Sequence, residues 1–341
     1  MKDQPPSLEQ WKDLYDAAVK FKEAEPWDWM WDSDLFGVQN PATGEIGYCC
    51  VMGRLGEHFA LGLYLGTEGL QAYLKIAAED LSPDDMLQVQ RCLMASFEDR
   101  KLLSKEDLDI IKRLGLKFRG RQAWPVFRSY QPGFFPWYLT SDEAQYLTLA
   151  LQQTIHVAMR FQDDPDMLAP PVENQYLIRV PEKSVDGLQW KDVWLEPRPL
   201  ERVSTPAQAI DAGRLQRLTE SIPKRQGIWE FDFSYSPVPA RDNAGERPYF
   251  PHVIFCVDQD SGFVLACDLV SPAEPVSGLA EHVVAAAERM GFLPREIRVR
   301  REELLQALEP VTSRLGVRLK LTRNLAELGR ARRAMFKFLE R

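Results

Sequence analysis

Three tryptophans near the N-terminus lie among aspartates, in a segment whose side chains could bind a ligand. Trp27, Trp29 and Trp31 alternate with other residues between positions 26 and 34, where three aspartates also occur. Tryptophan is favoured at binding hot spots and stacks on bases or cations, and the aspartates would favour a cationic or metal-bearing ligand. The structural alternative is that the tryptophans fix the first helix on the following strands while the aspartates face water. The segment predicts either a ligand or partner surface or a packing motif.

Basic residues recur along one face of the last predicted helix, which begins near Asn324. Their spacing of three, four and four residues places them on one side of the helix: Arg330, Arg333, Lys337 and Arg341. Such a face can follow a phosphate backbone with salt-dependent affinity. It is equally typical of a solvated helix surface. Nucleic-acid binding through these residues is therefore one of two hypotheses.

Charge is distributed unevenly along the 341 residues. The whole chain carries −8, whereas residues 289–341 contain 14 Lys and Arg against 6 Glu and carry +8. Residues 1–288 therefore carry −16. This split predicts either a basic surface for an acidic partner such as nucleic acid, or docking of the basic helix on the acidic N-terminal part of the chain.

Several common catalytic signatures are absent from the sequence. It has no G-x-S-x-G, Walker A or H-E-x-x-H motif, and no G-x-G-x-x-G follows a predicted strand. The five cysteines are odd in number and form no C-x-x-C pair, which argues against a disulfide framework or a thiolate zinc site and favours a cytoplasmic protein. No apolar run approaches the roughly 18 residues of a membrane span, and no export signal is readable. We expect no membrane partner.

The N-terminal part of the chain has the pattern of an α+β domain. An amphipathic helix is predicted over residues 8–24, and a longer helix over about 142–161. Between them, three short runs rich in Val, Tyr, Phe and Leu, separated by turn residues, predict an antiparallel meander: residues 34–39, 46–52 and 59–65. We interpret residues 1–170 as an aromatic-rich α+β domain of unknown function.

In the last third of the chain, strand and helix signals follow the order β-β-β-α-β-α-β-α. In the first of these strands, residues 228–235, the large apolar residues alternate with Glu230, Asp232 and Ser234. The two sets must therefore lie on opposite faces of the strand. The pattern predicts an α/β domain over residues 227–341, joined to the first domain by a bridging hairpin and helix over residues 171–226.

This order of elements resembles the core of the ribonuclease H and integrase superfamily. The resemblance implies carboxylates that hold two Mg²⁺ or Mn²⁺ ions, which activate water and stabilise the leaving oxygen. Asp232 matches the carboxylate of the first strand. The integrase branch has a further acid at the end of the fourth strand, where this chain has arginine at Arg300 and Arg301. The remaining candidate catalytic acids are Glu281 and Glu288 on the first helix and Glu327 near the start of the last.

Taken whole, the chain resembles a bacterial family of uncharacterised proteins with two adjacent domains of unknown function. The resemblance rests on Pro-Trp-Asp-Trp-Met at 26–30, on the run from Leu35 to Cys49, and on Arg-Pro-Tyr-Phe-Pro at 247–251. It implies no known activity. We predict a cytoplasmic, non-catalytic binding or regulatory protein without a cofactor, carrying a degenerate ribonuclease H-like domain. The alternative is a metal-dependent nuclease that uses Asp232 together with the candidate acids of the helices.

Overall fold

The computed structural model describes residues 4–78, 86, 89–184, 187–200, 210–243, 245–272 and 276–339. The chain divides into two compact units. The first consists of Met1–Pro132 with Pro136–Glu201, and the second of Gly133–Phe135 with Arg202–Arg341. Each unit has its own sheet and its own hydrophobic core. None of the helices described is long and apolar enough to span a membrane.

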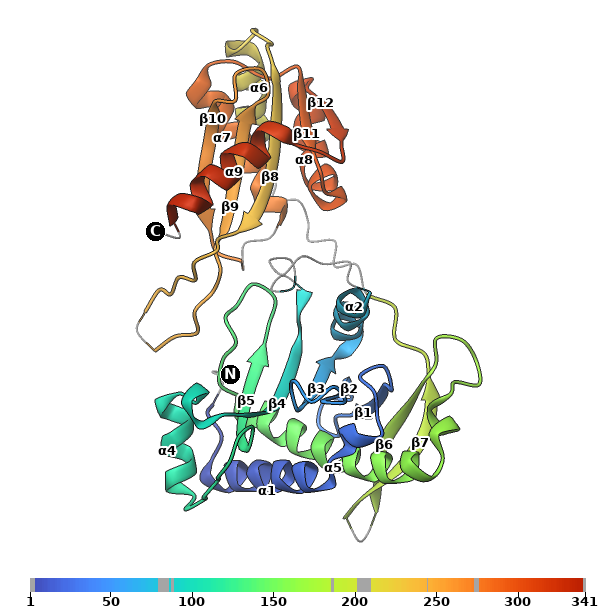
Figure 1. The fold of residues 1–341 in the computed structure, drawn as a ribbon. Coiled ribbons are helices and arrows are strands. Elements are labelled where there is room, and N and C mark those ends of the chain that lie inside the picture. Colours follow the sequence, from blue (N-terminus) through green and yellow to red (C-terminus); the bar gives the residue numbers. More distant parts are fainter. Residues whose placement is uncertain are drawn as a thin grey trace. The chain divides into compact units, whose positions relative to one another are not determined.

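The first unit contains a seven-stranded sheet in the order β5-β4-β3-β2-β1-β6-β7 (Figure 1). Neighbouring strands are antiparallel, apart from β1 and β6, which are parallel. The predicted antiparallel meander is confirmed as β1, β2 and β3. The strands are β1 Phe36–Gln39, β2 Ile46–Met52, β3 Ala60–Leu65, β4 Cys92–Glu98, β5 Trp124–Tyr130, β6 Tyr176–Ser184 and β7 Gly187–Leu195.

Helices cover both faces of this sheet. The largest core cluster lies on the face covered by α1 and α5, and a second, tyrosine- and cysteine-rich cluster lies on the face covered by α2. Capping boxes at Ser7, Ser104 and Thr140 begin α1, α4 and α5. The helices are α1 Leu8–Ala24, α2 Gly66–Ala77, α4 Lys105–Arg113 and α5 Ser141–Asp163, with short 3₁₀ turns at Pro26–Asp28, Arg100–Leu102 and Pro165–Leu168.

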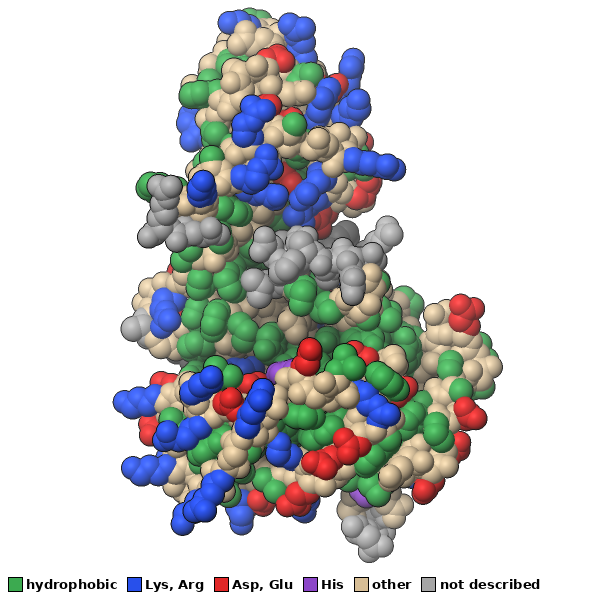
Figure 2. All heavy atoms as spheres, in the orientation of Figure 1, with side chains coloured by type: hydrophobic (Ala, Val, Ile, Leu, Met, Phe, Trp, Pro, Cys, Tyr) green, Lys and Arg blue, Asp and Glu red, His purple; other side chains and the backbone are tan. Residues whose placement is uncertain are grey.

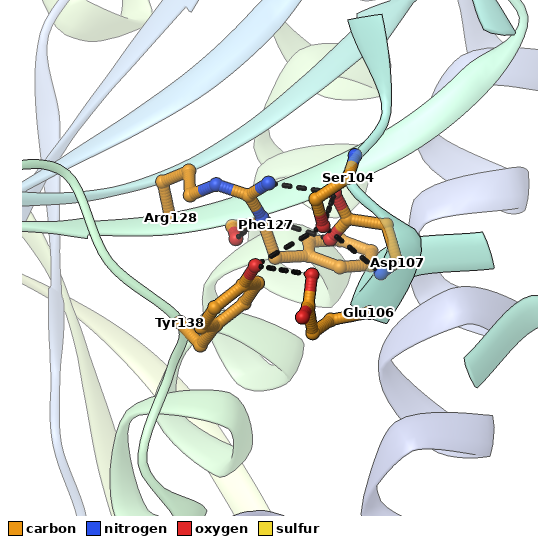
Figure 3. Close-up of polar contacts among 6 residues, drawn as sticks. All are labelled: Ser104, Glu106, Asp107, Phe127, Arg128 and Tyr138. Atoms are coloured by element: carbon orange, nitrogen blue, oxygen red, sulfur yellow. Dashed lines mark hydrogen bonds and ion pairs between the residues drawn. The ribbon is translucent and has the colours of Figure 1, made fainter. Parts of the chain in front are cut away.

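An ion pair between the buried Asp107 and the partly buried Arg128 fixes α4 against β5 (Figure 3). The Arg128 guanidinium donates to both oxygens of Asp107, at 2.9 and 2.6 Å, and Ser104 donates to the same carboxylate. Burial alone would raise the pKa of the Asp107 carboxyl, but hydrogen bonds and charge from Arg128 hold it below its usual value. Tyr138 completes the network, because its hydroxyl donates to Glu106 and lies 3.1 Å from the Ser104 hydroxyl, and its ring lies against the Arg128 guanidinium.

The second unit contains a five-stranded sheet in the order β10-β9-β8-β11-β12. β8, β9 and β10 are antiparallel to their neighbours in this group, whereas β8, β11 and β12 are parallel. The order of elements expected for residues 227–341 is present. The elements are α6 Ala212–Ser221, β8 Ile228–Tyr235, β9 His252–Asp258, β10 Val264–Val270, a 3₁₀ turn at Val276–Leu279, α7 Ala280–Met290, β11 Glu296–Val299, α8 Glu302–Leu315, β12 Arg318–Leu321 and α9 Ala326–Leu339.

The two faces of the second sheet are covered by different helices. Trp229, Phe231 and Phe233 of β8 pack into the core formed with α6, α7 and α8. The opposite face, with Val253 and Phe255 of β9, packs against α9. The alternation predicted for β8 is therefore correct, and it places Glu230, Asp232 and Ser234 on the α9 face.

The segment predicted as a bridge, residues 171–226, is divided between the two units. Its hairpin, β6 and β7, belongs to the first sheet because β6 pairs with β1 through Gly37 and Val38. Its helix, α6, contributes Leu215 and Leu218 to the second core. The predicted bridge is therefore divided, with its hairpin in the first unit and its helix in the second.

A short segment from earlier in the chain completes the second unit. The Phe135 N–H donates to the Pro248 carbonyl at 2.9 Å, and the Phe250 N–H donates to the Gly133 carbonyl at 2.8 Å. Arg247 Nε donates to the Phe135 carbonyl. The Arg-Pro-Tyr-Phe-Pro motif at 247–251 is therefore hydrogen-bonded to residues 133–135 through the backbone.

Candidate functional site: an arginine-lined cleft

A cleft of about 340 Å³ lies in the second unit, where Asp232 of β8 and the carboxyl ends of β11 and β12 meet the first turns of α9. In open α/β sheets, ligands bind outside the carboxyl ends of the strands. The space-filling view shows blue Lys and Arg side chains gathered over the α9 face of this unit (Figure 2). The charged residues that line the cleft are Asp232, Arg300, Arg323, Arg330, Arg332 and Arg333.

Asp232 is held by arginine on both carboxylate oxygens. Arg301 Nε lies 3.1 Å from one oxygen, and a terminal nitrogen of Arg300 lies 3.3 Å from the other. The Asp232 side chain is only 3% exposed, whereas that of Arg300 is 42% exposed. Arg301 also donates to the Phe233 carbonyl and lies over the Phe233 ring. The carboxylate is thereby neutralised, while Arg300 keeps N–H donors that face the cleft.

Glu230 positions the N-terminal end of α9 over β8. Its carboxylate is buried, and it accepts the Leu328 N–H at 2.8 Å, which satisfies a donor in the first turn of the helix. Leu325 and Leu328 pack beside it on Val253, Phe255 and Val257 of β9. These contacts bring the three arginines of the first two turns of α9 to the cleft.

The four candidate catalytic acids are not brought together. Glu281 and Glu288 lie on α7, which covers the sheet face opposite Asp232, and both bind Arg214 of α6. The Arg214 hydrogen bond lowers the pKa of Glu288. Glu327 pairs with Arg330 at 2.8 Å. Within the described residues, no group of three His, Cys, Asp or Glu side chains is arranged to hold a metal. In the part of the chain that the structure describes, Asp232 is bound by the guanidiniums of Arg300 and Arg301 and not by a second acid, and this set of positively charged neighbours does not fit a two-metal centre.

Part of the predicted basic helix face contributes to the cleft. Arg330 and Arg333 line it, and Lys337 is exposed one turn further along α9. Arg341 lies outside the described residues. Sequence reasoning missed Arg323 and Arg332 as site residues. The available signal was their position, because Arg323 follows the last parallel strand and Arg332 shares the first turns of α9.

The N-terminal tryptophans do not form a common exposed surface. Trp27 is 4% exposed and packs on Phe21, Phe59 and Phe97. Trp29 is partly buried, and its indole N–H donates to the Ala158 carbonyl of α5 at 2.9 Å. Trp31 is 48% exposed and stacks with Arg54. The segment therefore packs the first core, as the structural alternative predicted, and leaves one tryptophan accessible.

Three of the solved structures that are similar to part of this chain come from viral integrases or an intasome. The chain is 15% identical to the catalytic core domain of BIV integrase, over 34% of its own length and 70% of that chain, with a TM-score of 0.27. It is 17% identical to a chain of the simian T-cell lymphotropic virus intasome in complex with PP2A regulatory subunit B56 gamma. That similarity covers 34% of this chain and 41% of the other, with a TM-score of 0.27. It is 15% identical to the HTLV-2 integrase catalytic core domain in complex with magnesium. That similarity covers 34% of this chain and 70% of the other, with a TM-score of 0.26. No curated protein matches the chain.

Two family models match the sequence in succession. Residues 11–179 match the family described as Domain of unknown function (DUF7309), and residues 214–336 match Domain of unknown function (DUF6930). The first match contains β1 to β5 and the start of β6, and the second contains all five strands of the second sheet. Two adjacent families of unknown function, DUF7309 and then DUF6930, are therefore found along the chain.

Proposed function

We propose that this protein is a non-catalytic nucleic-acid-binding protein whose second unit binds phosphate groups through the arginine-lined cleft. The observation that carries the proposal is the convergence of Arg300, Arg323 and the arginines of α9 at the carboxyl ends of two parallel strands, β11 and β12. Arginine is suited to phosphate because its planar guanidinium donates two parallel hydrogen bonds. The +8 charge of residues 289–341 would attract a polyanion from a distance.

For the fold of the second unit, we propose a degenerate ribonuclease H-like core. The support is the order of its elements, β-β-β-α-β-α-β-α, together with the place of Asp232 on the central strand. In this interpretation, Arg300 and Arg301 stand at the end of the fourth strand, where the integrase branch carries an acid. Exchange of acid for arginine converts a cation-binding position into an anion-binding one.

The alternative, a metal-dependent nuclease, would require a different arrangement of side chains. Asp232 would have to release both guanidiniums before it could bind a divalent cation. Glu281 and Glu288 would have to leave Arg214 and reach the opposite face of the sheet. We therefore favour a binding function over the nuclease alternative.

We further propose a reducing, cytoplasmic location. Five free cysteines support this, four of which are buried. Burial raises the pKa of the Cys49 and Cys92 thiols to about 12, so these side chains behave as apolar core residues.

The test is fluorescence anisotropy of labelled single-stranded DNA, duplex DNA and RNA in Mn²⁺, at about 50 and 200 mM salt. We expect binding that weakens steeply with salt and no cleavage on a denaturing gel. The Arg330→Ala/Arg333→Ala variant should bind more weakly and with a smaller salt slope. Arg314→Ala on α8, which covers the other sheet face, is the matched control and should bind like the wild type. Absence of binding at both salt concentrations would refute the proposal.

A further inference from the structure

We propose that the arginine-lined cleft recognises the terminal phosphate of a nucleic-acid strand, a phosphomonoester, in preference to the phosphodiesters within the strand. The inference rests on the proposed nucleic-acid binding and names the group that would enter the cleft. It is carried by the concentration and direction of the positive charge around a single cavity.

The arginines surround the cleft from three separate segments. Arg300 follows β11, Arg323 follows β12, and the remaining three arginines come from α9. A surface that follows a strand needs positive charges spaced along a groove, one for each phosphate contacted. Here five arginines line one space of about 340 Å³, and Lys337 continues the basic face only one turn beyond it. This arrangement suits one highly charged group better than a series of singly charged ones.

A terminal phosphate has the matching chemistry. A phosphomonoester carries a charge of about −1.5 to −2 at pH 7 and offers three acceptor oxygens. An internal phosphodiester carries one negative charge. Guanidiniums from several directions can each donate a pair of hydrogen bonds to such a group. The additional charge and the additional acceptor are therefore both recognised by the same set of side chains.

Asp232 acts in this scheme as a positioning residue. Its carboxylate is the acidic group within the cleft lining, and it is already bound by Arg300 and Arg301. Arg300 thus points into the cleft with donors to spare. Glu327 is the neighbouring acid on α9, and it pairs with Arg330, whose side chain is 74% exposed. A terminal phosphate would compete with Glu327 for Arg330.

The experiment uses one single-stranded sequence with an internal fluorescent label in three forms: 5′-phosphate, 3′-phosphate and hydroxyl at both ends. We expect one of the phosphorylated forms to bind about tenfold more tightly than the hydroxyl form. Arg332→Ala should remove most of this preference, Arg332→Lys should keep part of it, and Arg314→Ala should leave it unchanged. The readout is the ratio of affinities, and Arg314→Ala controls for the loss of one positive charge away from the cleft.

The possible outcomes separate this inference from the proposed function. Equal affinity for all three forms would overturn the inference and leave nucleic-acid binding intact. Failure of every form to bind would overturn both. Inorganic phosphate and a nucleoside monophosphate are added as competitors. If either displaced the labelled strand as effectively as an unlabelled phosphorylated strand, the strand would contribute nothing, and recognition of a strand end would be refuted.

Discussion

Arg301 Nε lies 3.1 Å from Asp232 Oδ1, so the acid at the centre of the second sheet is bound by the residue that precedes α8. A guanidinium in this position occupies the carboxylate oxygen that a metal ion would otherwise use as a ligand. Arg300 and Arg301, which follow β11, both point toward Asp232 of β8. Because Asp232 is bound by arginine, its negative charge is balanced, and the cleft favours anions over cations.

The Asp232→Asn variant separates the binding and nuclease hypotheses. We expect nucleic-acid affinity to be retained, because the substitution removes a negative charge from a basic cleft. The second unit should lose roughly 1–3 kcal/mol of unfolding free energy, since two guanidiniums lose a charged partner. Anisotropy and thermal unfolding measure both effects, with the exposed Asp260→Asn as control. Metal-dependent cleavage by the wild type that Asp232→Asn abolishes would favour the nuclease.

The Arg128→Met variant should destabilise the first unit by about 3 kcal/mol, because the buried Asp107 carboxylate would lose its charged partner. Native-state hydrogen exchange of β5 peptides reports this unit separately. Since the pKa of Asp107 is lowered in the folded state, the pair stabilises above the unfolded pKa and this contribution is lost as the pH falls. The double variant Arg128→Met/Asp107→Leu should recover much of the loss; an additive double variant would show that the two residues are not coupled.

His252 should make the second unit sensitive to mild acid. Burial, followed by the charge of Arg301, lowers its pKa to about 4, and neither ring nitrogen has a hydrogen-bond partner within the described residues. The unfolded state therefore binds the proton first, and stability should fall between about pH 6.5 and 4.

Replacement of the imidazole tests this origin of the acid sensitivity. The His252→Phe variant should flatten the pH dependence, as measured by hydrogen exchange of β9 peptides at pH 7.5 and 5. His58→Gln, at an exposed position of the first unit, should leave it unchanged. An acid sensitivity that persists in His252→Phe would assign the effect to other groups.

Truncation of Trp27 should destabilise the protein far more than truncation of Trp31. Trp27→Ala creates a cavity among Phe21, Phe59 and Phe97 and should cost about 3–5 kcal/mol. Trp31→Ala should change stability by less than about 0.5 kcal/mol, as is usual for surface positions. Chemical denaturation of both variants decides the matter. Similar losses would mean that the exposed tryptophan also contributes to packing.

Local patterns predicted much of the architecture, and contacts distant in sequence account for the rest. The alternation in β8 correctly assigned Trp229 and Asp232 to opposite faces, because side-chain direction in a strand is a local property. The cleft required the ends of β11 and β12 to meet β8 and α9, and no periodicity shows that Arg323 and Arg332 approach Arg300. The tryptophan segment was ambiguous for a similar reason, since the 3₁₀ turn at Pro26–Asp28 directs Trp27 inward only in the presence of the sheet.

The parallel pairing of β1 with β6 also affects how the first domain forms during synthesis. Gly37 pairs with Ile178, which emerges from the ribosome about 140 residues later, or roughly 10–30 s at usual elongation rates. Until then one edge of β1 lacks its native neighbour and presents unpaired N–H and C=O groups, a template for pairing with other chains. Nascent chains that stop before β6 should therefore be the forms of this protein most dependent on chaperones.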